Sequence, residues 1–163
     1  ASKRVVFFDT LLARLNTDEI ESVLAHELGH FKHHHVIKRI VMLFSVSFLG
    51  LALLGWLMQQ PWFYNGLGVQ NASNYMALML FLLVSPVFLF LMRPLMASYS
   101  RKNEFEADAY AAKQASAKDL VSALVKLYRD NAATLTPDPL HSAFYDSHPP
   151  ASLRIAKLAA YSS

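Results

Sequence analysis

The stretch VLAHELGHFKHHHVIKRI, residues 23–40, runs directly into the uncharged segment IVMLFSVSFLGLALLGWLM, residues 40–58. The first stretch places five histidines within ten residues, and the second has 19 residues without a charge. At a helical rise of ~1.5 Å per residue the second stretch is roughly 28 Å long, close to the ~30 Å hydrocarbon thickness of a bilayer. The junction therefore predicts metal-binding side chains at the edge of a membrane-spanning helix.

A second uncharged run covers residues 75–92 and contains Pro86. Membrane helices tolerate proline where neighbouring groups, such as the Ser85 hydroxyl, satisfy the freed carbonyl. The whole chain of 163 residues is 54% hydrophobic and only 17% charged, which is more apolar than an ordinary soluble domain. We expect both runs to span a bilayer. The alternative is a pair of buried hairpin helices in a large soluble assembly.

The segment between the two runs, residues 59–74, is rich in turn residues and has no charged side chain. Its aromatic residues are expected at the membrane interface: Trp62, Phe63 and Tyr64. Basic residues flank the opposite ends of the two runs, namely Lys32, Lys38, Arg39, Arg93, Arg101 and Lys102. The positive-inside rule therefore places both termini and the histidines in the cytoplasm. These basic residues account for the net charge of +3, and they are expected to meet anionic lipid headgroups. The charge therefore calls for no nucleic-acid partner.

The histidine-rich stretch is predicted to be a helix that starts after Asn16, with Glu19 completing a capping box. Its apolar stripe consists of Ile20, Val23, Leu24, Leu28 and Phe31. His26 and His30 are four residues apart, so they share a face and can reach one zinc ion at ~2.0 to 2.1 Å. Glu27 lies ~100° around the helix, where it can deprotonate a water at the metal. The chain has no cysteine, so any metal is held by nitrogen and oxygen.

A hydrolytic zinc site needs a third protein ligand and an open fourth position. The stretch SYSRKNEFEADAYAAKQ, residues 98–114, offers Glu104, Glu106 and Asp108. Glu104 and Asp108 share a helix face, whereas Glu106 points the opposite way. One carboxylate of the pair can bind the metal while the other supports a ligating histidine. The alternative is that these acids balance neighbouring basic residues on a solvated face.

Taken together, VLAHELGHFKHH and SRKNEFEADAYA resemble the integral-membrane zinc metalloprotease family that contains the CAAX prenyl protease, or a-factor-converting enzyme, and the bacterial stress-response protease HtpX. The stretches KRVVFFDTLL and SHPPASLRI and the two intervening runs also occur in that family's order. The resemblance implies one zinc ion per chain, held by His26, His30 and Glu104. It further implies that Glu27 is the general base and that Asp108 supports the metal ligands.

The resemblance also implies roles for His148 and Arg154 in the stretch DSHPPASLRIAKL. Both are expected to reach the active site and to stabilise the oxyanion of a tetrahedral intermediate. The alternatives are a loop histidine and a surface charge. For the run His33 to His35 we expect a polar role at the membrane edge, because consecutive helical residues point to different faces and cannot converge on one ion.

The expected architecture is mainly helical, with two transmembrane helices and a cytoplasmic zincin-like catalytic part. We predict a single peptidase domain over residues 1–163. Its segments are the HELGH helix (1–39), the first span (40–58), a loop (59–74), the second span (75–92) and the third-ligand helix with the C-terminal helices (93–163). A small strand is predicted over residues 3–8, where β-branched and aromatic residues gather. With neither an initiator methionine nor a signal-peptide pattern, the chain is expected to be part of a longer protein.

The predicted function is that of a membrane-embedded zinc metalloendopeptidase that cuts a lipidated or membrane-bound polypeptide with a zinc-activated water. It would act in the bacterial inner membrane or the endoplasmic reticulum, with the site facing the cytoplasm. An HtpX-like protease that trims damaged membrane proteins is one alternative. A non-catalytic metal-binding scaffold is another, and it would have no need of Glu27. A transporter would place ionisable groups inside its spans, and neither run has one.

Overall fold

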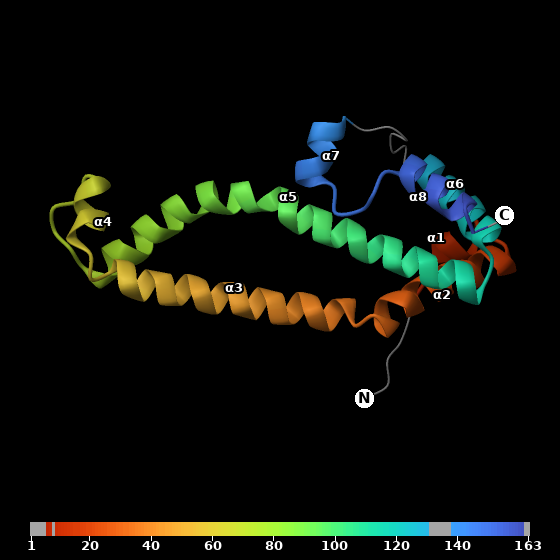
Figure 1. Cartoon of the computed structure of the whole chain (residues 1–163), viewed down its shortest axis with the longest axis horizontal. Helices are drawn as coiled ribbons and strands as arrows, with labels where there is room; N and C mark the ends of the chain where they lie inside the picture. The colour runs from red at the N-terminus through yellow and green to blue at the C-terminus, as the bar shows by residue number, and fades with distance from the viewer. Residues whose placement is uncertain (1–5, 8, 131–137, 162–163) are drawn as a thin grey trace. The chain divides into compact units, whose positions relative to one another are not determined.

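The computed structural model describes residues 6–7, 9–130 and 138–161. Within these ranges the chain is helical and contains no strand, as the predicted fold class requires. The described helices are α1 (Asp9–Leu12), α2 (Thr17–Lys32), α3 (His35–Leu57), α4 (Pro61–Gly66), α5 (Asn74–Gln114), α6 (Ala117–Asp130), α7 (Pro139–Tyr145) and α8 (Ala151–Ala159) (Figure 1). The strand predicted over residues 3–8 lies outside the described residues except for Val6 and Phe7, which belong to no regular element.

The chain divides into two compact units. The first, which we call the histidine unit, comprises Ala1–Val36 and Pro94–Ser163. The second, which we call the hairpin unit, comprises Ile37–Arg93. Helices α3 and α5 each contribute to both units. The predicted single domain with its five segments stays a prediction.

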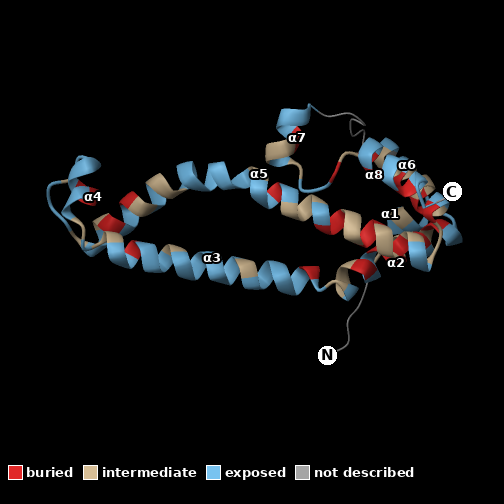
Figure 2. Cartoon of the chain, viewed as in Figure 1, coloured by how far each residue is buried: buried red, intermediate tan, exposed pale blue. Residues whose placement is uncertain are grey.

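The hairpin unit presents apolar helices with little protein around them. Helices α3 and α5 are both long and apolar enough to cross a membrane. Only 11% of the most apolar window of either helix is buried inside the structure. Figure 2 shows α3 and the first half of α5 as largely exposed. Because the core helix of a soluble protein is mostly buried, this exposure fits the two predicted membrane spans.

The connection between the two runs contains α4, which closes the hairpin unit with a small apolar cluster. Phe63 and Tyr64 are buried in it, and the Tyr64 hydroxyl donates to the Met58 carbonyl at 3.0 Å. The other buried members of the cluster are Leu54, Ala77 and Leu80. Trp62, in contrast, is 56% exposed. Of the three aromatic residues predicted at the membrane interface, two therefore pack inside the hairpin unit, and Trp62 is exposed.

In the histidine unit, α2 begins with the predicted capping box. The Asn16 side chain accepts from the Glu19 backbone N–H, and the Glu19 carboxylate accepts from the Asn16 N–H, both at 2.8 Å. Glu19 is buried and also accepts from Lys126 Nζ at 2.7 Å and from Ser122 Oγ at 2.6 Å. These hydrogen bonds, that of Lys126 first, lower the pKa of Glu19 to about 2. One carboxylate thus caps α2 and fixes it to α6.

The buried face of α2 differs from the predicted apolar stripe. Leu28 in that stripe is 44% exposed, and its other members are only partly buried. The residues that α2 buries are small or polar, namely Glu19, Ser22, Ala25, His26 and Gly29. A Cβ atom at Gly29 would lie 2.9 Å from Ala107 Cα, so α5 approaches too closely for any larger side chain. The predicted stripe is therefore confirmed in part, since Val23 packs against the apolar core, and it is wrong for Leu28 because close helix contact also selects the buried face.

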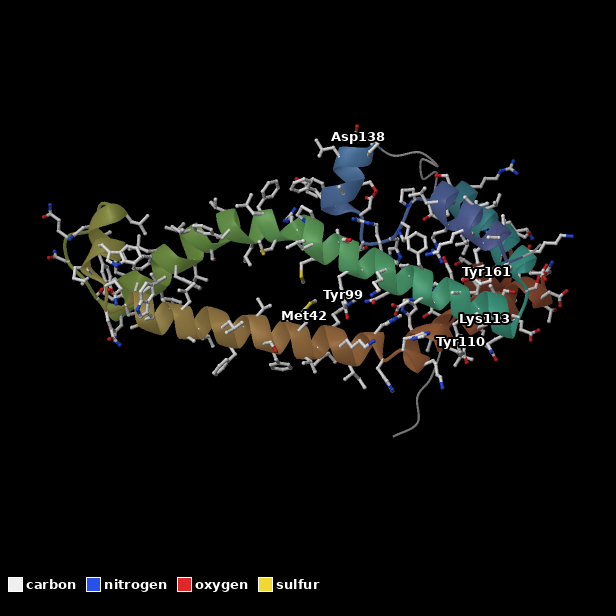
Figure 3. The ribbon with its side chains drawn as sticks, in the orientation of Figure 1. Met42, Tyr99, Tyr110, Lys113, Asp138 and Tyr161 are labelled. Atoms are coloured by element: carbon white, nitrogen blue, oxygen red, sulfur yellow. The ribbon has the colours of Figure 1, made fainter. Side chains whose placement is uncertain are left out.

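Helix α6 packs against both α2 and α8 in the histidine unit. The apolar core shared by α2, α5, α6 and α8 consists of Ala25, Ala111, Leu120, Leu124 and Leu158. Figure 3 labels Tyr110 on the part of α5 that lies beside α2, and its Cβ would be 3.2 Å from a Cβ at Gly29. This packing sets the second half of α5 against the helix that carries HELGH.

Helix α5 carries both the predicted second span and the predicted third ligand. It passes through Pro86 and Pro94 and continues to Gln114 without ending. The sequence predicts a span that ends at residue 92 and a third-ligand helix after it, and the structure joins the two in one helix. The helix is continuous because no glycine, the residue that commonly ends a helix, occurs between residues 92 and 114.

Candidate metal centre

Two histidines from α2 and one carboxylate from α5 converge in the histidine unit. The Nε2 atoms of His26 and His30 are 3.2 Å apart. Glu104 places Oε2 3.6 Å from His26 Nε2 and Oε1 3.5 Å from His30 Nε2. The two imidazole rings are almost perpendicular, at 81°. Because their planes intersect, one point can lie in the plane of both rings, as the lone pairs of two ligating histidines require.

This donor set suits a zinc ion. Two imidazoles and one carboxylate are a ligand set of catalytic zinc sites, and the three donor atoms lie within 4.8 Å of one another. His26 and Glu104 are buried. Burial, with a smaller contribution from the neighbouring His26, lowers the pKa of His30 to about 4. His30 is therefore neutral near pH 7, the state in which an imidazole can bind a metal.

Asp108 and Arg154 contact His26 and Glu104, two of the three donors. Asp108 lies four residues after Glu104 on α5, and its Oδ1 is 2.9 Å from His26 Nδ1. Arg154 of α8 donates to both oxygens of Asp108, from Nε at 2.8 Å and from Nη2 at 2.6 Å. Its Nη1 lies 3.6 Å from Glu104 Oε2. Arg154 is only 6% exposed, so the surface-charge alternative for this residue is wrong.

His148 reaches the same carboxylate from the loop before α8. Its Nδ1 is 3.0 Å from Glu104 Oε2, yet 64% of its side chain is exposed. Arg101 anchors the start of this loop, because its Nη1 donates to the carbonyls of Ser142 and Asp146, both at 3.0 Å. The sequence reasoning treated Arg101 only as a flanking charge. Its place three residues before Glu104, in the stretch SRKNEFEADAYA, is the signal that could have singled it out.

Glu27 follows His26 directly, but its side chain is exposed rather than buried with the ligand group. This agrees with the ~100° that separates neighbouring residues on a helix. The structure thus gathers His26, His30, Glu104, Asp108, His148 and Arg154 into one group of contacts. Glu27 stands next to that group, where water can reach its carboxylate.

The histidine run after HELGH breaks the helix and does not continue it. Helix α2 ends at Lys32, and His34 has a left-handed φ of 55°, after which α3 begins at His35. The His33 and His35 rings therefore lie on one side, with centroids 5.5 Å apart, and Glu106 is close to both. The prediction that these histidines point to different faces assumed an unbroken helix, so it is wrong for His33 and His35.

Comparison with known proteins gives a consistent picture. Residues 1–162 match the sequence model of peptidase family M48. CAAX prenyl protease 1 of Saccharomyces cerevisiae is 34% identical over 172 residues, which cover 96% of this chain and 38% of that protein. The CAAX prenyl protease 1 homolog of Arabidopsis thaliana is 35% identical over 150 residues, covering 91% of this chain and 35% of that protein.

A solved structure is similar as well. The crystal structure of S. mikatae Ste24p superimposes with a TM-score of 0.80 at 35% identity, over 97% of this chain and 39% of that chain. This chain spans less than half of the length of the relatives that it matches.

Proposed function

Since this chain belongs to peptidase family M48, we propose that it forms the catalytic part of a membrane-embedded zinc metalloendopeptidase of the CAAX prenyl protease type. The observation that carries the proposal is the convergence of His26, His30 and Glu104 on one point. Two of these donors lie in an HELGH motif, the spacing that zinc metalloproteases use.

One zinc ion per chain would be held by His26, His30 and Glu104. When bound, zinc polarises the scissile carbonyl and lowers the pKa of a water at the open position towards ~7. Three protein donors would leave the fourth position of a tetrahedral ion for that water. Asp108 holds Nδ1 of His26, and Arg154 holds Asp108, so this pair orients the ligand.

Glu27 acts as the general base in this proposal. It accepts a proton from the attacking water as the water oxygen bonds to the carbonyl carbon, and it delivers that proton to the leaving amine as the C–N bond breaks. His148 is exposed beside Glu104, where it can donate a hydrogen bond to the oxyanion. Arg154 is committed to Asp108, so we assign it a positioning role.

The proposed substrate is a polypeptide with a prenylated C-terminus, as the names of the matching relatives indicate. The two apolar helices, which are long enough to cross a membrane, support a location in a bilayer. Basic residues flank these helices on the side of the histidine unit, so we propose that the site faces the cytoplasm. Cleavage of a farnesylated peptide, but not of the same peptide without the lipid, would support this specificity. Equal rates on both would refute it.

The experiment that tests the mechanism compares two glutamates of α2 that are both exposed, Glu27 and Glu21. Because Glu27 carries the proton, Glu27→Gln should lower the cleavage rate by ~10²- to 10⁴-fold while one zinc per chain remains bound. Glu21→Gln should change neither quantity. Glu104→Ala should lose the metal, measured by mass spectrometry of the purified protein. An unchanged rate in Glu27→Gln would refute the assigned base, whereas a wild-type protein that binds zinc but cleaves no peptide would favour the non-catalytic scaffold.

A further inference from the structure

His30 has a partly buried contact through its second ring nitrogen. Its Nδ1 lies 2.8 Å from Nδ1 of His35. The other nitrogen of His35, Nε2, lies 3.1 Å from Glu106 Oε2. His35 is only 2% exposed, so protein groups rather than bulk water satisfy its ring. A line of contacts therefore leads from Glu104 through His30 and His35 to Glu106.

We propose that His35 and Glu106 form a relay that fixes the tautomer and orientation of His30, and so raises the affinity of the centre for zinc. The inference rests on the zinc site proposed above. A neutral imidazole has one N–H, so a His30 that binds the metal through Nε2 carries its hydrogen on Nδ1. That hydrogen is donated to Nδ1 of His35. His35 then carries its own hydrogen on Nε2 and donates it to Glu106, so each contact has one donor and one acceptor.

The relay gives the two histidine ligands equivalent support by different routes. His26 contacts the Asp108 carboxylate directly, at 2.9 Å. His30 reaches a carboxylate only through the ring of His35. In metal sites the second nitrogen of a ligating histidine almost always donates to such a partner. Without His35, His30 would lack this partner.

A competing interpretation is that His33, His35 and Glu106 bind a second ion, because their donor atoms lie within 4.8 Å of one another. Two observations oppose it. The rings of His33 and His35 are stacked within 14° of parallel, so their lone pairs do not point to a common position. Moreover, a metal on Nε2 of His35 would put the ring hydrogen on Nδ1, which would set two N–H groups against each other at the 2.8 Å contact with His30. The relay and a second ion therefore exclude each other.

The test measures the zinc dissociation constant of the purified protein in detergent by competition with a chromophoric chelator. His35→Leu introduces an apolar side chain of similar size and removes both ring nitrogens. It should weaken zinc binding by ~10- to 100-fold. His35→Asn places Oδ1 near the position of Nδ1, so it should restore most of the affinity by accepting from His30. His33→Gln is the matched control, because it alters a neighbouring histidine outside the relay and should leave the affinity unchanged.

Further readouts separate the relay from simple support of the fold. With Co²⁺ in place of zinc, His35→Leu should alter the visible absorption bands and His35→Asn should retain the wild-type bands. Unchanged zinc affinity in a folded His35→Leu variant would overturn the relay. So would two ions in the wild-type chain with one lost in His33→Gln. If the wild-type protein binds no zinc, or if His30→Ala does not reduce binding, the zinc site fails independently of the relay.

Discussion

The two units of the chain follow opposite rules of burial. The histidine unit buries charged and polar groups, among them Glu19, His26, Glu104, Asp108 and Arg154. The hairpin unit exposes large apolar side chains, such as Phe44 at 70%, Phe48 at 72% and Leu83 at 69%. Buried charges are tolerated where they pair with one another, as Asp108 and Arg154 do. Exposed apolar helices are tolerated where lipid surrounds them. The difference indicates that the histidine unit folds in water and that the hairpin unit is surrounded by lipid.

The largest expected effect is on membrane insertion, and it is tested by placing a lysine at an exposed apolar position in each unit. Leu49, in the middle of the uncharged run of α3, is 65% exposed, and Val125 on α6 is 46% exposed. A lysine at the centre of a membrane span costs about 2.5 to 3.5 kcal/mol, so Leu49→Lys should reduce insertion roughly 100-fold. Val125→Lys lies in the water-facing unit and should change stability by less than about 0.5 kcal/mol.

Membrane insertion of both variants can be measured by resistance to alkaline extraction and by protection from added protease. If Leu49→Lys inserts as well as the wild-type chain, the hairpin unit is not lipid-facing at that position. If Val125→Lys also fails to insert, the two units do not differ in being surrounded by lipid and by water.

A second test uses the glycines, because the two units place them in different surroundings. A Cβ at Gly29 would lie 2.9 Å from Ala107 Cα and 3.1 Å from the Ala107 carbonyl oxygen, whereas a Cβ at Gly55 would meet nothing within 4 Å. Overpacking at Gly29 should cost about 1 to 3 kcal/mol. It should also move Glu104 away from the histidines and weaken zinc binding. Gly55→Ala should be tolerated.

Thermal unfolding in detergent, followed by circular dichroism, measures the effect of each substitution on stability. The prediction for Gly29 concerns stability and zinc affinity together. A Gly29→Ala variant that unfolds earlier but binds zinc as tightly as the wild type would show that the close contact stabilises the fold without setting the ligand geometry.

Much of the fold could be predicted from the sequence because its signals are local. The two long apolar helices follow from uncharged runs, and the start of α2 follows from the capping box of Asn16 and Glu19. The continuity of α5 is not visible in the hydropathy pattern, because the uncharged run ends before Arg93 while the helix continues to Gln114. The burial of Phe63 and Tyr64 was missed because it depends on long-range packing within the hairpin unit.

The candidate site shows the same division. The spacing of His26 and His30 and the shared face of Glu104 and Asp108 are helical periodicities, which a sequence displays directly. The positions of His35 and Gly29 are not of this kind. His35 reaches His30 only because the backbone turns at His34, and Gly29 matters only because α5 passes close to it. Both depend on how separate elements pack together, which the periodicity within one helix does not reveal.

The pH dependence of stability is expected to involve Glu19, the buried carboxylate that joins α2 to α6. Its pKa is lowered from the ordinary value of 4.5 to about 2, mainly by Lys126 and then by Ser122. The unfolded chain therefore takes up a proton at Glu19 before the folded chain does. The contribution of Glu19 to stability is complete above about pH 4.5 and is lost as the pH falls towards 2.

Thermal unfolding of the wild-type protein and of Glu19→Gln, measured between pH 7 and pH 2, isolates this contribution, because the other carboxylates are common to both. The difference between the two proteins should be constant down to about pH 4.5 and should then narrow as the wild type becomes protonated. Lys126→Gln removes the largest cause of the lowered pKa, so in that background the difference should be smaller and its loss should be complete at a higher pH. A difference that stays the same down to pH 2 would mean that Glu19 does not bind α2 to α6 through its charge.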